Sequence, residues 1–292
     1  RRDIGEPDTR YRPSTMAAVL ARRCRDMLWR YRSRFATTPL AHQPVMTIII
    51  LTAAALLGGA LNALAGGGSL VTFPALLFAG LNPIDANASS VVALFPATFA
   101  SAWAYRRRIF DVAEVSVTGL SILSLLGGVL GAVLLLSTPT SVFARLVPWL
   151  VLFSTVIFAV GNFAPLDVIR RLEPGPRGAL TAHFVISVYG GYFGGGIGFL
   201  LLAALTLFGM RDINAMNGLK MWLVGIMTLA SMATFIVADV IRWSQVLPML
   251  LGSAIGGYVA AHAAQRLDQR LIKGFVIVLG VGVTAYFFWH GV

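Results

Sequence analysis

MTIIILTAAALLGGALNALAGGGSLVTFPALLFAGL, residues 46–81, contains no charged side chain and has a cluster of glycines near its middle. A helix that crosses a bilayer needs about 20 mostly apolar residues, because the hydrocarbon is roughly 30 Å thick and a helix rises about 1.5 Å per residue. The stretch is long enough for one full crossing, near 46–64, and for a shorter apolar segment near 68–81. Because unpaired backbone groups are costly in hydrocarbon, we expect both segments to be helical.

Composition extends this membrane pattern to the rest of the chain. Of its 292 residues, 57% are hydrophobic and 12% are charged, whereas about 25% of a typical soluble domain is charged. Long runs without Asp, Glu, Lys or Arg recur as far as the C-terminus. None of them alternates apolar with polar residues, as the strands of a membrane barrel do. The composition therefore predicts an all-α polytopic membrane protein and argues against a soluble fold.

The apolar segments form two sets of five. We expect the first set near 46–64, 68–81, 86–105, 115–137 and 146–164, and the second near 178–193, 196–210, 218–238, 244–264 and 273–290. Each set contains a glycine break, a short apolar run, a polar turn and a long helix, in the same order. Such internal duplication is the usual architecture of secondary transporters. We therefore divide the chain into a basic leader (1–45), a first transmembrane repeat (46–166), a linker (167–177) and a second transmembrane repeat (178–292).

Charge placement leaves two properties of this arrangement open. Residues 1–45 carry ten arginines and four acidic residues, which favours either an amphipathic helix on an anionic membrane face or a disordered leader. Ten spans would place the basic groups at 106–108 and 266–273 in the cytoplasm but would export the leader. Eight spans would keep the leader inside and expose 266–273. The positive-inside rule therefore does not choose between eight and ten transmembrane segments.

Two glycine-rich breaks are the features that indicate a binding site. Ala65 to Ser69 interrupts the first repeat, and Gly190 to Gly198 interrupts the second. The run after the first break contains Pro74 and reaches Gly80 after only about 14 residues, or about 21 Å of helix, so we expect broken or re-entrant helices. A helix that begins inside a membrane presents free N–H groups and a partial positive charge, which glycines let an anion approach closely. The alternative is that these glycines only allow close helix packing.

Polar residues beside the breaks complete the predicted site. Lys220 either meets the charge of a substrate or extends to the membrane interface. Asp85 either caps the next helix or relays protons, and His183 either carries a proton or forms a hydrogen bond between helices. The residues expected to bind substrate are Asn62, Gly66, Gly67, Gly68, Ser69, Ser89, Ser90, Gly194, Gly195, Gly196, Gly198, Asn217 and Lys220.

Motifs of other function classes are missing from the sequence. It has no phosphate-binding Walker loop, no Gly-x-Ser-x-Gly elbow and no His-Glu-x-x-His pair. Cys24 is the single cysteine and the four histidines lie far apart, which predicts neither a disulfide nor a metal site. The net charge of +11 concentrates beside apolar runs, which indicates a bilayer rather than nucleic acid as the partner. We therefore expect a transporter without a cofactor rather than an enzyme, with an anion channel and a non-transporting scaffold or sensor as alternatives.

Taken in order, these motifs resemble the TauE/SafE family of sulfite-exporter-like membrane proteins. The resemblance runs from about Ile48 to Phe288 and rests on glycine motifs and polar turns in both repeats. The motifs are Gly58-Gly59, Ala65 to Gly68, Pro74 to Gly80, Asn87 to Ser90, Tyr105 to Arg108, Gly190 to Gly198, Gly209 and Asn217 to Lys220. The resemblance implies ATP-independent transport of a small sulfur-containing anion such as sulfite, sulfoacetate or another organosulfonate. We expect alternating access in a bacterial inner membrane, and we leave proton coupling and a homodimer open.

Overall fold

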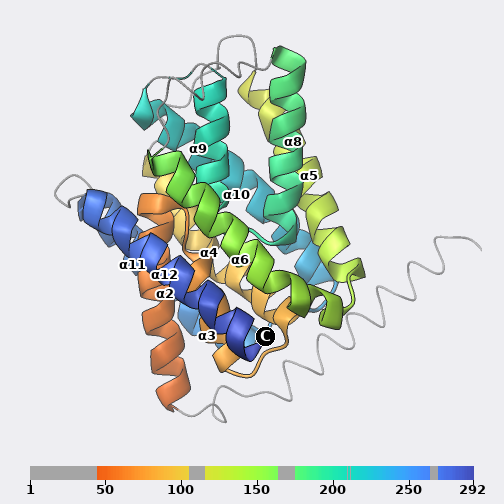
Figure 1. Ribbon diagram of the computed structural model, residues 1–292, viewed down its shortest axis with the longest axis vertical. Coiled ribbons are helices and arrows are strands. Elements are labelled where there is room, and N and C mark those ends of the chain that lie inside the picture. Colours follow the sequence, from red (N-terminus) through yellow and green to blue (C-terminus); the bar gives the residue numbers. More distant parts are fainter. Residues whose placement is uncertain (1–44, 105–115, 164–174, 209, 211, 264–268) are drawn as a thin grey trace, which may run out of the picture. The chain divides into compact units, whose positions relative to one another are not determined.

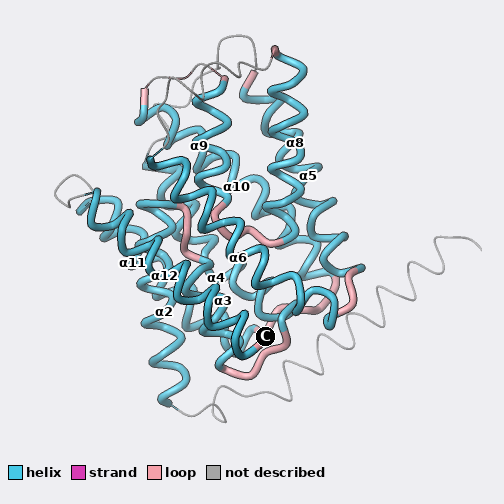
Figure 2. Tube along the Cα trace, viewed as in Figure 1, coloured by secondary structure: helices cyan, strands magenta, loops and turns pink. Residues whose placement is uncertain are grey.

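The computed structural model describes residues 45–104, 116–163, 175–208, 210, 212–263 and 269–292, and within those ranges it consists of α-helices joined by short connections, without a strand (Figures 1 and 2). The helices are α2 (Val45–Ala65), α3 (Ser69–Phe78), α4 (Pro83–Ala104), α5 (Val117–Ser137), α6 (Thr140–Phe163), α8 (Pro176–Tyr192), α9 (Ile197–Leu207), α10 (Ile213–Val237), α11 (Trp243–Ala263) and α12 (Gln269–His290).

Each of the ten predicted apolar segments coincides with one of these helices, which confirms the all-helical prediction. The main differences lie at helix starts: α4, α6 and α10 begin three to six residues before the predicted bounds. The predicted bounds of the first two excluded Asp85 and Arg145, but these residues are the third of α4 and the sixth of α6. A helix start tolerates a charged side chain because it lies at the end of the apolar run.

Length and composition make four of the described helical stretches suitable for crossing a bilayer. These stretches are Val45–Leu64, Val117–Ser137, Thr140–Ile157 and Ala215–Val237. On α5 the large apolar side chains Leu125, Leu126 and Val129 point outward, whereas the buried face carries small residues such as Gly127 and Ser124. Small residues inside and large apolar residues outside are typical of helices that pack together within lipid.

Two helices, α3 and α9, are too short to cross a bilayer. They contain 10 and 11 residues, or about 15 Å of helix each. Each follows a glycine break, at Gly66 to Gly68 and at Phe193 to Gly196. The prediction that Pro74 interrupts the first short run is wrong, because α3 continues through Pro74 to Phe78. The glycines therefore set the limits of these short helices.

The first helix of each set packs along the fourth helix of the other set. Helix α2 lies along α11 and α8 lies along α5, while α4 also packs on α11 and α10 on α5 (Figure 1). Small residues make the close approaches: a Cβ on Gly59 would overlap the backbone of Ser253, and one on Gly127 would lie 2.5 Å from the Cβ of Ser187. The sequence halves therefore interlock in one bundle of α2, α4 and α11 and another of α5, α8 and α10, and the two bundles pack together through α4 and α10.

Several predictions fall on residues outside the described ranges. The basic leader, the Arg106–Arg108 cluster and most of the 167–177 linker lie there. Four features stay predictions: the amphipathic leader, the domain bounds, the duplication and the choice between eight and ten spans.

Candidate functional site

The first break turns the chain sharply inside the protein. Gly66 has a φ of +73°, a left-handed conformation that glycine adopts without steric cost. Its N–H donates to the carbonyls of Leu61 and Asn62, at 3.0 and 2.9 Å, and so closes α2. The cap of α3 is Gly68, which offers no side-chain oxygen to the first N–H groups of that helix. Because Gly66 to Ser69 are all buried, the positive end of α3 lies in the protein interior.

The second break is built in a similar way but is anchored by side chains. Gly194 and Gly196 have φ values of +75° and +70°. Between them, the carbonyl of Gly195 lies 2.8 Å from the hydroxyl of Ser154 and 3.0 Å from that of Tyr189. Its carbonyl oxygen is therefore held toward α6 and α8, and α9 begins directly afterwards at Ile197. Ser154 and Tyr189 were not predicted, because nothing in the sequence relates them to the glycine motif.

The two breaks lie against each other. A Cβ placed on Gly66 would stand 2.7 Å from the Cα of Gly198, the second residue of α9. Just beyond, the rings of Phe73 on α3 and Phe193 in the second break pack edge to face, with centroids 5.8 Å apart. The predicted glycines Gly66 to Gly68 and Gly194 to Gly198 are thus brought together, at the start of two short helices.

The starts of α4 and α10 supply buried polar groups near the short helices. Ser90 on α4 lies 2.6 Å from the hydroxyl of Thr72 on α3. The amide nitrogen of Asn87 donates to the carbonyl of Tyr192, the last residue of α8, at 3.1 Å. Lys220 is fully buried and its ammonium donates to the side-chain oxygen of Asn217 at 2.9 Å. Lys220 therefore does not extend to the protein surface. The alternative prediction, that it extends to the membrane interface, required an exposed side chain.

Helix α10 carries Lys220 along the second short helix. Leu219 and Leu223 share a buried cluster with Ile197 and Leu201 of α9. Asn62, the remaining predicted group of the first repeat, is buried before the break, and its amide nitrogen donates to the hydroxyl of Thr98 at 2.8 Å.

Comparison with known proteins identifies the family of this chain. The model of the sulfite exporter TauE/SafE family matches residues 51–287. The chain belongs to the TauE/SafE family. It is similar to a probable membrane transporter protein of Haemophilus influenzae, 30% identical over 77% of this chain and 88% of the relative. It is also similar to the probable membrane transporter protein ORF9 of a Sinorhizobium species, 27% identical over 81% and 90%, and to YfcA of Escherichia coli, 26% identical over 87% and 92%. No solved structure matches the chain. This TauE/SafE protein is therefore an integral membrane transporter.

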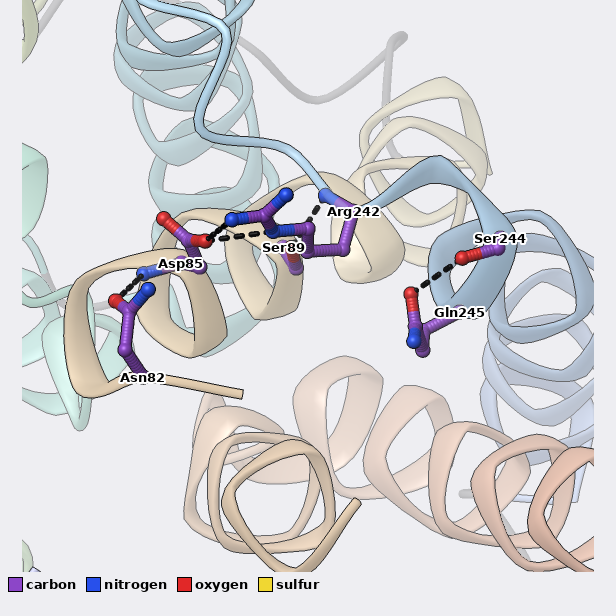
Figure 3. Close-up of polar contacts among 6 residues, drawn as sticks. All are labelled: Asn82, Asp85, Ser89, Arg242, Ser244 and Gln245. Atoms are coloured by element: carbon purple, nitrogen blue, oxygen red, sulfur yellow. Dashed lines mark hydrogen bonds and ion pairs between the residues drawn. The ribbon is translucent and has the colours of Figure 1, made fainter. Parts of the chain in front are cut away.

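Asp85 of the TauE/SafE chain forms an ion pair that the sequence did not predict. The prediction that Asp85 caps a helix is wrong: the side-chain oxygen of Asn82 caps α4, accepting from the N–H of Asp85 at 3.0 Å. The carboxylate of Asp85 instead pairs with Arg242, whose Nε donates to it at 2.6 Å (Figure 3). The N–H of Arg242 also donates to the hydroxyl of Ser89, at 3.1 Å. Ser89 therefore belongs to a contact between α4 and the α10–α11 connection.

Arg242 was missed, although the sequence contained a signal. Asp85 is the only charged residue between Phe35 and Tyr105. Arg242 and Asp239 stand between two long runs without charge. An isolated charge such as Asp85 needs an opposite charge nearby, so Arg242 was one candidate partner, with Asp239 as its competitor in sequence.

His183 forms the hydrogen bonds between helices that one of its two interpretations predicted. It is fully buried on α8, and its Nε2 lies 2.9 Å from the hydroxyl of Ser124 and 3.0 Å from the carbonyl of Leu120, both on α5. Nδ1 of the same ring is buried and has no hydrogen-bond partner among the described residues, so a proton relay through Asp85 or His183 stays a prediction.

We expect loss of Arg242 to destabilise the transporter more than loss of the Asp85 charge. Arg242→Gln leaves a carboxylate that is only 8% exposed without its cation, whereas Asp85→Asn frees an arginine that is 40% exposed and accessible to water. The free energy of unfolding should fall by about 1–3 kcal/mol for Arg242→Gln and by about 0–1 kcal/mol for Asp85→Asn.

Thermal unfolding of the purified variants in detergent measures this difference. Ser244→Ala is the control, because the Ser244 hydroxyl bonds to Gln245 rather than to the ion pair (Figure 3). Equal losses for the two charge variants would contradict the asymmetry.

Proposed function

We propose that this TauE/SafE protein transports a small sulfur-containing anion, sulfite or an organosulfonate, across a bacterial inner membrane by alternating access. The name of the matching family, sulfite exporter, supports the substrate class, and the similar proteins named above come from bacteria. The single observation that carries the proposal for the site is the approach of Gly66 to Gly198, where the break before α3 meets the start of α9 inside the protein.

This meeting point has the chemistry that an anion needs. Helix starts present unsatisfied N–H groups and a partial positive charge, and glycine leaves the backbone open to a close ligand. No acidic residue lies between Phe35 and Ile84 or between Gly178 and Met210, so no carboxylate from either segment opposes an anion there. The proposed ligands are the backbone at Gly66 to Ser69 and at Gly194 to Gly198, with Ser90 beside the first short helix.

Lys220 supplies the positive charge in this proposal. It is 0% exposed and has the oxygen of Asn217 as a hydrogen-bond partner. An ammonium has three N–H donors, so two are left for other acceptors. Burying such a cation is costly unless a counter-charge arrives, and a bound sulfite or sulfonate would be that counter-charge.

The two interlocked bundles are the parts that would move in this proposal. Because α2, α4 and α11 pack together and α5, α8 and α10 pack together, each unit contains helices from both sequence halves. The breaks join these units to the short helices, so rocking one bundle against the other would change which side of the membrane the meeting point faces.

Counterflow in proteoliposomes tests the proposal. We expect vesicles preloaded with unlabelled sulfite or organosulfonate to take up the labelled anion faster than empty vesicles, with a rate that saturates. Phosphate-loaded vesicles control for nonspecific exchange. Uptake that rises linearly with concentration and is indifferent to preloading would indicate a channel, and would overturn alternating access. No uptake of any sulfur anion by folded protein would overturn the substrate class.

A further inference from the structure

Two buried side-chain atoms in the described part of the chain lack a hydrogen-bond partner, Nδ1 of His183 and the side-chain oxygen of Asn87. The oxygen is an acceptor in a residue that is only 1% exposed. Its orientation is fixed, because the amide nitrogen donates to the carbonyl of Tyr192 and a carbonyl can only accept. An orphaned buried acceptor is costly, so its presence indicates a ligand that carries positive charge or donates a hydrogen bond.

Helix α10 carries the same asparagine at the corresponding position, with its oxygen occupied. Asn87 is the fifth residue of α4 and Asn217 is the fifth residue of α10. In α10 the oxygen of Asn217 accepts from the ammonium of Lys220, three residues later. The residue three positions after Asn87 is Ser90, which has no charge. The side-chain oxygen of Asn217 on α10 thus binds a lysine ammonium, whereas the same oxygen of Asn87 on α4 has no cation beside it.

The surroundings of Asn87 are rich in neutral oxygen atoms. Ser90 lies one helical turn away, on the same face of α4, and its hydroxyl contacts that of Thr72; both residues are 0% exposed. Tyr192, to which Asn87 bonds, is the last residue of α8, and the final carbonyls of a helix carry a partial negative charge. Backbone carbonyls of unwound segments and the C-terminal ends of half-helices coordinate sodium in transporters with broken helices, and the amide and hydroxyl oxygens here are neutral oxygens as well.

We propose that Asn87, Ser90 and Thr72 form a binding site for a monovalent alkali cation, which takes the place that the Lys220 ammonium has beside Asn217. The neighbouring carboxylate, Asp85, is paired with Arg242. Calcium and magnesium bind mainly through carboxylates, so this set of neutral oxygens favours a singly charged ion. Resting on the proposed anion transport, the site would supply the coupling ion that moves with the anion.

Replacing Ser90 with lysine gives the sharpest test. Ser90→Lys reproduces the arrangement of Asn217 and Lys220, so its ammonium should occupy the Asn87 oxygen permanently. Asn87→Ala removes the oxygen instead. Ser101→Ala is the matched control, because Ser101 is a buried serine of α4 that bonds only to its own helix, at the carbonyl of Ala97.

The measurement is thermal unfolding in detergent without any sulfur anion, in sodium, potassium or N-methylglucamine chloride at equal ionic strength. A ligand that binds only the folded state raises its melting temperature. We expect the wild type and Ser101→Ala to melt a few degrees higher in sodium or potassium than in N-methylglucamine, and both Ser90→Lys and Asn87→Ala to lose this difference.

The outcomes separate this inference from the proposed function, because the assay contains no transported anion. A melting temperature of the wild type that is the same in all three salts would overturn the cation site and assign the Asn87 oxygen to water. A cation response retained in Ser90→Lys would overturn it as well. If Ser90→Lys does not fold, the response of Asn87→Ala decides in the same way.

Discussion

Replacing Lys220 with methionine should weaken anion transport strongly while leaving the protein at least as stable as the wild type. A charge-assisted hydrogen bond is worth about 1.5–3 kcal/mol, so its loss should raise the apparent KM about 10- to 100-fold. The stability of Lys220→Met should be equal to that of the wild type or higher. Lys220 is 0% exposed, with Asn217 as its hydrogen-bond partner, and an apolar side chain of similar length avoids the desolvation of a buried charge.

Two measurements on the same preparation check this prediction: concentration-dependent counterflow in proteoliposomes and thermal unfolding in detergent. Leu219→Met is a suitable control, because it changes the shape of an adjacent fully buried residue of α10 and leaves the charge in place. Wild-type KM in Lys220→Met would show that another group meets the charge of the substrate. A large loss of stability would show that the ammonium is needed for the fold.

The second large effect is expected from Gly66→Ala, compared with Gly80→Ala. Both glycines have positive φ, +73° and +87°, so each alanine meets about 1–2 kcal/mol of backbone strain. Only Gly66 is also confined, because its Cβ would stand 2.7 Å from the Cα of Gly198, whereas nothing lies within 4 Å of a Cβ on Gly80. Overpacking should therefore lower the free energy of unfolding of Gly66→Ala by a further amount of about 1–3 kcal/mol. The same variant should not transport.

Comparing the two variants separates backbone strain from contact between the breaks. We expect Gly80→Ala to transport at a rate close to that of the wild type, despite a lower melting temperature. Gly66→Ala should insert into the membrane but show no counterflow in vesicles that contain equal amounts of folded protein. Equal transport by the two variants would mean that the approach of the breaks is not needed for function.

The local properties of the chain were predictable from sequence, because they depend on short-range patterns. Runs without charge located all ten helices, and the glycines located the ends of α2 and α8. Pro74 was misjudged because a proline inside a helix removes only one backbone hydrogen bond, and α3 continues past it to Phe78. Asp85 and Arg145 were excluded from the predicted segments because composition alone does not show where a helix begins.

Contacts between distant segments were less predictable, and for Asp85 the sequence offered only a candidate partner. Neither the pairing of Asp85 with Arg242 nor the bond from Asn87 to Tyr192 follows from any spacing along the chain. The orphaned oxygen of Asn87 is visible only once its amide nitrogen has a partner in three dimensions. The predicted glycine site was located from duplicated motifs, but its contact at Gly66 and Gly198 required the folded structure.

The pairing of α2 with α11 has a consequence for how the protein is made. Gly59 and Ser253, which touch across this pair, are separated by roughly 200 residues, and contacts so distant in sequence form late. During synthesis, α2 enters the bilayer long before α11 leaves the ribosome. The glycine-lined face of α2 then has only lipid, or a temporary protein neighbour, to cover it. Biogenesis of this transporter thus includes an interval in which a newly inserted helix waits for the partner that completes it.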